Sequence, residues 1–339
     1  MRMSRRSTLF GGGKRGPKIK YYGTATPFSV SVSDMASAFT DDYAFFGSGF
    51  SYTTTVVASD IVYAYDKDLT QSVLAALSSK RYKLAATSIN NHVLFGGGFV
   101  AGTGKVDTVE AYDSNLTKKT LASLSVARDA LGACSNKKYA LFFCGESKKG
   151  RVGTVDAYDE NFTRVTATNA YSLDNPKSTA IGDFVMIGGG GLGGSAAVIA
   201  YDDNLTRSSV GYMKYNRADN AAAAVGNFAV FGGGTCSEDA SLSADAFDLD
   251  FTMHDTTPFT YPRATPAAIN FGNCAMFVGG GSIYGDAASR IPEAYDEKLT
   301  KHFLEECPIM VTSNTAASKV GNFALFKSGA NVLVYKSLD

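Results

Sequence analysis

The stretch AAAAVGNFAVFGGG, residues 221–234, carries the pattern that decides the fold of this chain. A run of alanines and a valine leads into Gly226-Asn227, a pair that tolerates the positive φ of a two-residue hairpin turn. Apolar residues and three glycines follow. The stretch therefore predicts a strand of small side chains that turns tightly into an apolar strand ending in glycine.

The same pattern recurs seven times along the 339 residues, at intervals of 44 to 49 residues. The apolar residues before the glycines or their weaker copies, here called the anchors, are Phe46, Phe95, Phe142, Ile187, Phe231, Phe277 and Phe326. A second motif, aromatic-Asp-x-x-Leu/Phe-Thr, begins at Tyr65, Tyr112, Tyr158, Tyr201, Phe247 and Tyr295, and a further aromatic, Tyr335, lies near the end. Units of about 45–50 residues with four strands each are typical of β-propeller blades.

The fold predicted from this repetition is all-β, a seven-bladed β-propeller of four-stranded antiparallel blades. The innermost strands crowd around one axis, which requires the small residues found nine and ten positions before nearly every anchor. The last copy ends after its third strand, and an unpaired strand edge promotes aggregation. We therefore expect an N-terminal strand at about residues 17–28 to pair with residues 331–336 and complete blade 7. Residues 1–16 then form a basic flexible N-terminal arm, and residues 17–339 form the propeller.

Three motifs resemble those of kelch-repeat proteins: the Gly-Gly doublet, the Tyr-Asp pair before a turn, and an Arg before the inner strand. The chain has no Trp, and the residues expected to fill the apolar position of the kelch Trp are Leu69, Leu116, Phe162, Leu205, Phe251 and Leu299. The chain is similar to kelch-like proteins encoded in bacterial and phage genomes, some of which are thought to be virion or surface adhesins. The resemblance implies recognition or adhesion, on a phage virion or a bacterial surface.

Composition and cysteine usage exclude several classes of protein. No apolar run reaches the ~18 residues of a membrane helix, and the N-terminus lacks the apolar core of a signal peptide. We therefore expect cytoplasmic synthesis without membrane insertion. The number of cysteines is odd and no C-x-x-C pattern occurs, which favours free thiols in a reducing compartment. The cysteines are Cys134, Cys144, Cys236, Cys274 and Cys307.

Charge is unevenly distributed along the chain. Residues 1–20 hold seven basic side chains and no acidic one, which leaves 25 basic and 32 acidic side chains in residues 21–339. An acidic body argues against a nucleic-acid partner. The basic arm is interpreted either as a solvated tail or as a segment that docks to a larger assembly.

The two faces of the predicted ring differ in their connections. The Gly-Asn and Tyr-Asp turns lie on one side, here called the turn face, and are nearly constant in length. The loops from the glycines to the third strands, and the crossings between blades, lie on the other side, here called the loop face. The loop lengths vary widely. Insertions in repeat proteins gather on the binding face, so we expect a ligand at the loop face.

The candidate ligand-binding residues lie on this loop face. Fourteen residues before the anchor, four units carry an arginine: Arg81, Arg128, Arg217 and Arg263. These arginines suit bidentate bonds to a carboxylate or an acidic sugar near a channel mouth. The alternative is that each bonds loop carbonyls or a neighbouring blade. The loops add a mixture of aromatic and charged side chains that is typical of recognition surfaces: Tyr52, Phe99, Lys148, Arg151 and Tyr284.

No catalytic residue, metal site or cofactor is predicted. His92 begins a second strand, whereas His254 and His302 lie in outer strands, so the three histidines are too far apart to share a metal ion. The glycine runs lack the GxxxxGK[ST] phosphate-binding pattern. The favoured function is therefore non-catalytic recognition of a glycan or protein through the loop face. The alternatives are a carbohydrate-active enzyme that uses loop-face carboxylates and arginines, and a purely structural spacer.

Overall fold

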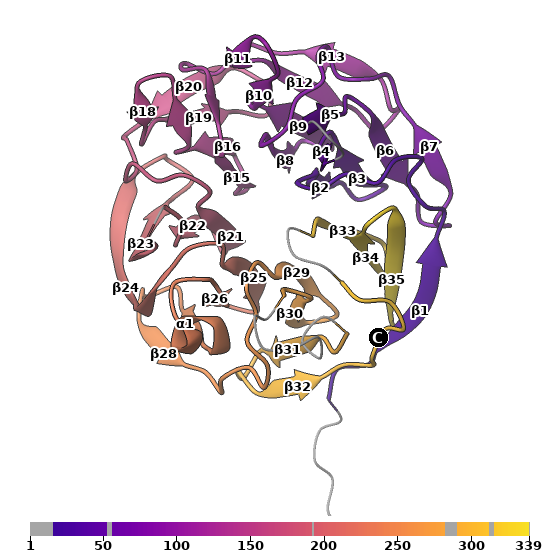
Figure 1. The fold of residues 1–339 in the computed structure, drawn as a ribbon. Coiled ribbons are helices and arrows are strands. Elements are labelled where there is room, and N and C mark those ends of the chain that lie inside the picture. The colour runs from indigo at the N-terminus through magenta and orange to yellow at the C-terminus, as the bar shows by residue number, and fades with distance from the viewer. Residues whose placement is uncertain (1–15, 53–55, 192, 282–289, 312–314, 339) are drawn as a thin grey trace, which may run out of the picture.

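The computed structural model describes residues 16–52, 56–191, 193–281, 290–311 and 315–338. Within these residues, seven four-stranded antiparallel sheets form the blades of the molecule. Figure 1 shows the sheets arranged around a central opening. The prediction of an all-β propeller is confirmed.

In blades 1 to 6 the first strand of each sheet is innermost and the fourth is outermost. Blade 1 consists of β2 (Ala36–Phe39), β3 (Ala44–Gly47), β6 (Val62–Tyr65) and β7 (Gln71–Val73). Blade 2 consists of β8 (Ala85–Ile89), β9 (His92–Gly96), β12 (Val109–Tyr112) and β13 (Lys118–Thr120). Blade 3 consists of β15 (Gly132–Ser135), β16 (Ala140–Phe143), β19 (Val155–Tyr158) and β20 (Arg164–Ala167). Blade 4 consists of β21 (Lys177–Ile181), β22 (Phe184–Gly188), β23 (Ser195–Tyr201) and β24 (Arg207–Arg217).

The remaining blades follow the same plan, and short elements decorate the loop face. Blade 5 consists of β25 (Ala221–Val225), β26 (Phe228–Gly232), β27 (Ala244–Phe247) and β28 (Met253–Asp255). Blade 6 consists of β29 (Ala267–Phe271), β30 (Cys274–Val278), β31 (Glu293–Asp296) and β32 (Lys301–Phe303). Blade 7 consists of β33 (Ala317–Val320), β34 (Phe323–Ser328), β35 (Asn331–Ser337) and β1 (Ile19–Ala25). The short elements are β4 (Phe50–Tyr52), β5 (Val56–Ala58), β10 (Phe99–Val100), β11 (Gly104–Lys105), β14 (Arg128–Asp129), β17 (Glu146–Ser147), β18 (Gly150–Arg151) and α1 (Glu238–Leu242).

The inner strands form a closed circle. Each of β2, β8, β15, β21, β25, β29 and β33 contacts the next, and β33 contacts β2. Small side chains allow the inner strands to approach one another closely. Serines on these strands form hydrogen bonds between blades. At the junction of blades 7 and 1, Ser37 Oγ donates to the carbonyl of Ala317 (2.7 Å), and Ser318 Oγ donates to the carbonyl of Ala38 (2.8 Å). Apolar clusters fill the spaces between neighbouring blades.

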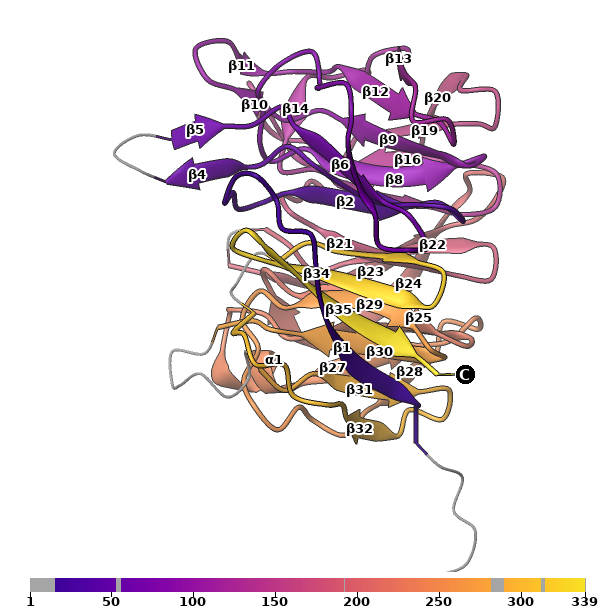
Figure 2. The same ribbon diagram turned by 90° about the vertical axis from the view of Figure 1, so that its right-hand side faces the viewer.

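The N-terminal strand completes blade 7, as the sequence predicted. β1 runs antiparallel to β35, with Ile19 opposite Ser337 and Ala25 opposite Val332, and Figure 2 shows the two strands side by side. The strand is shorter than the predicted 17–28 because the chain leaves the sheet before Pro27. Beyond that point Phe28 packs against the first blade, where its ring centroid lies 4.8 Å from that of Tyr63.

The turn face repeats one hydrogen-bonded turn six times in the described residues. The Oδ1 atom of the turn aspartate accepts from the backbone N–H groups two and four residues later, at 2.8–3.0 Å. The aspartates are Asp66, Asp113, Asp159, Asp202, Asp248 and Asp296. The Leu or Phe that follows has φ of 60–63° and contacts the preceding blade, as Phe251 does with Phe184 at a centroid distance of 5.1 Å. The constant geometry of these six turns indicates that the turn face has a structural role.

Candidate functional site

An axial cavity of about 850 Å³ opens on the loop face. It is lined by inner strands and by the residues that lead into them. Six of these residues, each two positions before the inner strand of one of blades 1 to 6, form the rim, here called the mouth ring: Asp34, Lys83, Ala130, Asn175, Asp219 and Thr265. All six have φ between 49° and 55°, in the left-handed region. Because the backbone geometry is the same, each of these blades presents one side chain to the same rim.

Two members of the mouth ring are joined by a hydrogen bond. The side-chain amide of Asn175 donates from Nδ2 to Asp219 Oδ1 (2.8 Å), which links blades 4 and 5. The ammonium group of Lys177 donates to Asn175 Oδ1, also at 2.8 Å. The amide of Asn175 therefore connects a positive and a negative side chain, and its orientation is fixed by both.

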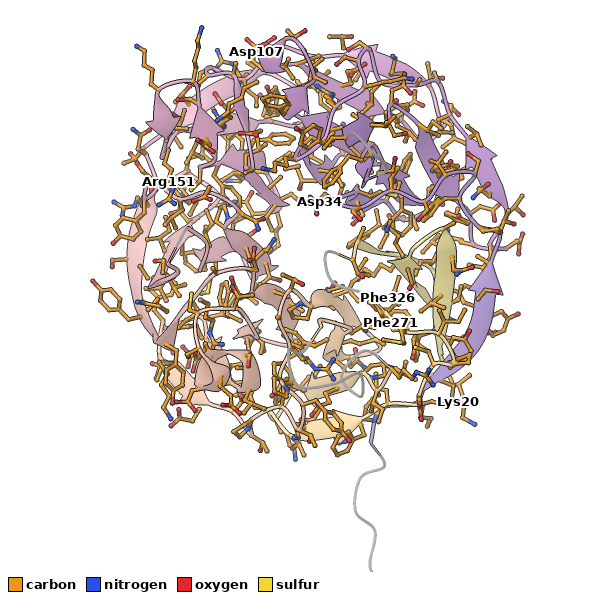
Figure 3. The ribbon with its side chains drawn as sticks, viewed as in Figure 1. Lys20, Asp34, Asp107, Arg151, Phe271 and Phe326 are labelled. Carbon is orange, nitrogen blue, oxygen red and sulfur yellow. The ribbon has the colours of Figure 1, made fainter. Side chains whose placement is uncertain are left out.

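The charged groups of the mouth influence one another. Burial raises the pKa of Asp34, while Lys177, Lys83 and Lys327 oppose the shift and Asp219 adds to it. Burial lowers the pKa of Lys177, and its interactions with Asp219 and Asp34 partly offset this effect. Figure 3 places Asp34 at the edge of the central opening. The cavity is therefore a polar site with charges of both signs.

An aromatic row borders the mouth on blades 1 and 2. The ring centroids of Phe50 and Tyr82 are 5.1 Å apart, and those of Tyr82 and Phe99 are 5.5 Å apart. Phe50 is buried, whereas Tyr82 and Phe99 are half-buried. Tyr82 directly precedes Lys83 of the mouth ring in the sequence, so the row lies close to the rim on blade 2. Phe99 is thus the predicted aromatic residue that lies in this row.

The other predicted loop residues lie farther out or outside the description. Lys148 and Arg151 are exposed in the hairpin formed by β17 and β18, and Arg151 Nε lies 2.7 Å from Asp174 Oδ1, in the lining of the cavity. Tyr52 ends β4, and only its backbone is described. Tyr284 lies outside the described residues.

The four arginines do not face a ligand. Arg81, Arg128, Arg217 and Arg263 have no exposed surface. Each forms an ion pair with a buried carboxylate in the third strand of the blade whose inner strand follows it in the sequence: Arg81 with Glu110 at 2.9 Å, Arg128 with Asp156 at 2.9 Å, Arg217 with Asp245 at 2.8 Å and Arg263 with Glu293 at 3.1 Å. Their burial removes them from the residues that a ligand on this face could contact. Arg81, Arg217 and Arg263 also donate to loop carbonyls, as the alternative interpretation expected, and Arg128 donates to the carbonyl of Phe142 in β16.

A sequence signal for these ion pairs exists. The acidic partner always stands two residues before the aromatic residue of the third strand. In blade 1 the corresponding positions hold Val32 and Tyr63, and in blade 4 they hold Leu173 and Ile199. Arginine and carboxylate are therefore present together or absent together in these blades. A buried charge without its partner is costly, which explains the joint replacement.

Comparison with known proteins bears on the fold. No protein family and no curated protein sequence matches the chain. A solved structure described as the structure of YjhT matches with a TM-score of 0.61 and 14% sequence identity, over 82% of this chain and 99% of that chain. The chain shares its propeller fold with YjhT. At this identity the likeness concerns the fold alone.

The described residues contain no helix of the length and apolar character needed to cross a membrane. They also contain no group of three or more His, Cys, Asp and Glu side chains that could hold a metal ion.

Asn220 at the cavity provides a first stability prediction. It is fully buried, and neither side-chain amide atom has a hydrogen-bond partner in the described structure. The corresponding residue is Met35 in blade 1 and Leu84 in blade 2. Replacing Asn220 by leucine removes two buried unpaired polar atoms, so Asn220→Leu is expected to raise the free energy of unfolding by about 1–2 kcal/mol. Urea unfolding measures this change.

The matched control for this prediction is Asn175→Leu. Asn175 lies in the neighbouring blade, and its amide is hydrogen-bonded on both sides. This replacement is expected to lower the urea midpoint rather than raise it. An equal decrease for both variants would show that the Asn220 amide has partners, and would contradict the prediction.

Proposed function

We propose that this protein is a kelch-like, non-catalytic recognition module that binds a glycan or a protein through its loop face, in an adhesion role on a phage virion or a bacterial surface. The observation that carries the proposal is the cavity of about 850 Å³ at the loop-face end of the axis. Pockets of this size, concave and lined by a few convergent polar groups, are typical of ligand sites. The aromatic row and the hairpins β4–β5, β10–β11 and β17–β18 lie on the same face.

The contrast between the two faces supports this location. On the turn face, one hydrogen-bonded turn is repeated with nearly the same distances. On the loop face, different elements stand at equivalent places: the hairpins β4–β5, β10–β11 and β17–β18, and the helix α1. Figure 2 shows the hairpin β4–β5 projecting from the body of the ring. Variation between otherwise equivalent blades favours recognition by the varied face.

Binding is favoured over catalysis by the state of the charged groups. The enzyme hypothesis required loop-face arginines and carboxylates together. The arginines are buried in ion pairs, and Asp219 accepts a hydrogen bond from Asn175. Asp34 is left as the carboxylate of the mouth ring to which no described residue donates a hydrogen bond. Glycoside hydrolysis ordinarily requires a pair of carboxyl groups. A single available carboxylate therefore favours binding of hydroxyl groups over hydrolysis.

The proposed function is tested by a glycan array together with a pull-down from host extracts. The variant replaces residues 145–153 by a short Gly-Ser link, and its control replaces the turn-face residue Lys137 by serine. Lys137 is exposed and pairs with Asp183 at the surface. We expect the loop variant to lose the ligand of the wild-type protein while the control retains it, with thermal unfolding showing both to be folded. Turnover of an arrayed sugar, or a ligand retained by the loop variant, would contradict the proposal.

A further inference from the structure

On blades 4 and 5 the polar side chains of the mouth bond one another. Asn175 bonds Lys177 on one side and Asp219 Oδ1 on the other. The hydroxyl group of Thr235 donates to the remaining oxygen of Asp219, at 3.4 Å. Both oxygens of this carboxylate therefore have a donor from the protein. A ligand on this side of the mouth would have to displace bonds that already exist.

Blades 1 and 2 contribute the charged members of the mouth ring that have no hydrogen-bond partner. The carboxylate of Asp34 is half-buried, and no described residue donates a hydrogen bond to it. The ammonium group of Lys83 is exposed and has no hydrogen bond or ion pair with a described residue. Both residues line the cavity of about 850 Å³. A carboxylate that is partly withdrawn from water without receiving a hydrogen bond is unfavourable, so the fold itself does not explain Asp34.

Loop-face hairpins are attached to the chain directly before these two residues. The residue before Asp34 exchanges backbone hydrogen bonds with Phe50 of β4, at 2.6 and 3.0 Å. Tyr82, which precedes Lys83, does the same with Phe99 of β10, at 2.8 and 3.1 Å. The hairpins β4–β5 and β10–β11 and the aromatic row thus belong to the same two blades as the unpartnered charges. Aromatic side chains together with a few polar groups are typical of small-molecule sites.

The charges that line the cavity are balanced. Asp174 is paired with Arg151. The other charged residues of the described lining are two lysines and two aspartates: Lys83, Lys177, Asp34 and Asp219. A ligand with a net charge of either sign would leave one charge uncompensated. Hydroxyl groups accept from an ammonium group and donate to a carboxylate without adding charge, so the lining favours an uncharged ligand rich in hydroxyl groups.

We propose that blades 1 and 2 bind an uncharged hexose at the channel mouth, either as a free sugar or as the end of a glycan. This inference rests on the proposed recognition function and names the class of its ligand. One hydroxyl group of the sugar donates to the carboxylate of Asp34, and another accepts from the ammonium group of Lys83. The half-buried ring of Tyr82 supplies apolar surface on the same blades. Small residues such as Ser37 line the cavity and leave room for a sugar ring.

Sugars that differ in one group test the requirement for an uncharged ligand. D-glucose, D-galactose and D-mannose carry no charge, whereas their uronates carry a carboxylate and their 2-amino forms carry an ammonium group. In titration calorimetry we expect at least one of the neutral hexoses to bind with a Kd of about 1 mM or below, and about tenfold more tightly than its two charged forms. A charged form that binds as tightly as its neutral hexose would overturn the inference. Immobilised glycans that end in the bound hexose distinguish a glycan from a free sugar, and binding of either supports the shared chemistry.

Asp34→Asn and Lys83→Ala test the assigned groups. Asparagine tolerates the left-handed backbone at residue 34, and blade 3 already has Ala130, with φ of 49°, at the position that corresponds to Lys83. Both variants are therefore expected to fold, which thermal unfolding checks. Each is expected to weaken binding of the hexose about tenfold, because each removes a hydrogen bond to a charged group. Unchanged binding in either variant would overturn the inference.

The matched control is Asp219→Asn. Asp219 has φ of 53° and Asp34 has φ of 51° at the same position of their blades, but both oxygens of Asp219 are bonded within the protein. The control is expected to bind the hexose within about twofold of the wild-type affinity. Equal weakening by Asp219→Asn and Asp34→Asn would show that the sugar is not held on blades 1 and 2, and would overturn the inference.

The outcomes separate this inference from the function on which it rests. Failure of all the sugars to bind, while the loop variant loses the array or pull-down ligand, would overturn the inference and leave the recognition function standing. A wild-type protein that binds neither an arrayed glycan nor a protein, and none of the sugars, removes both.

Discussion

Arg128→Leu alone is expected to lower the free energy of unfolding by about 3–4 kcal/mol. The replacement leaves the carboxylate of Asp156 buried without its main partner, since both side chains have no exposed surface and lie 2.9 Å apart. The expected cost lies toward the lower end of the range for broken buried pairs because Arg164 still contacts Asp156 at 2.8 Å. The midpoint of urea unfolding, followed by circular dichroism, measures the change.

The double variant Arg128→Leu/Asp156→Ile is expected to recover most of this loss, to within about 1–2 kcal/mol of the wild-type protein. It places in blade 3 the pair that blade 4 already uses, Leu173 and Ile199. Apolar side chains at both positions leave no fully buried charge unpaired, and Arg164, which loses its contact with Asp156, is 29% exposed and can be solvated. A double variant less stable than Arg128→Leu would show that the site requires the charges themselves, and would refute the explanation given for the joint replacement.

Deletion of residues 1–25 is expected to cost about 5 kcal/mol or more and to promote aggregation, because it removes β1 and exposes the edge of β35. The deletion also removes Ile19 from the core between blades 6 and 7. Thermal unfolding and size-exclusion chromatography measure both effects.

The control deletion removes residues 1–15 and keeps β1. It is expected to change stability by no more than about 0.5 kcal/mol, because it takes away no described contact. A synthetic peptide of residues 16–28, added to the longer deletion, is expected to restore part of the lost stability by pairing with β35. Equal stabilities of the two deletions would disprove the closure by β1.

The fold was predictable because each of its physical requirements calls for particular residue types at fixed spacings in the sequence. Inner strands need small side chains, hairpin turns need Gly or Asn, and the third-strand corner needs an aspartate that accepts backbone hydrogen bonds. The closure followed from counting strands, since the last copy lacked one. The bounds of β1 were less certain, because a preference for extended backbone in residues 17–28 does not show where Pro27 ends the pairing.

The site was only partly predictable. The loop face was deduced from variable lengths, and Phe99 does lie in the aromatic row beside the mouth. The arginines were named as candidate ligand residues, with bonds to loop carbonyls or a neighbouring blade as the alternative. Their carboxylate partners were not predicted, because these lie 28–30 residues away in the sequence. The mouth ring was missed altogether. Its members differ in type from blade to blade, and what they share is a left-handed φ that no residue pattern reveals.

The two ends of the described chain meet in blade 7, where the backbone N–H of Leu338 donates to the carbonyl of Lys18 at 2.8 Å. Because these two ends lie side by side, the ring of blades does not require the chain to begin at blade 7. Residues 18 and 338 could be joined by a short peptide and the chain reopened at a crossing between two blades, with every blade then built from consecutive residues. In the permuted chain, β35 and β1 would be consecutive strands joined as a hairpin. The order in which the blades are synthesised could then be varied by experiment.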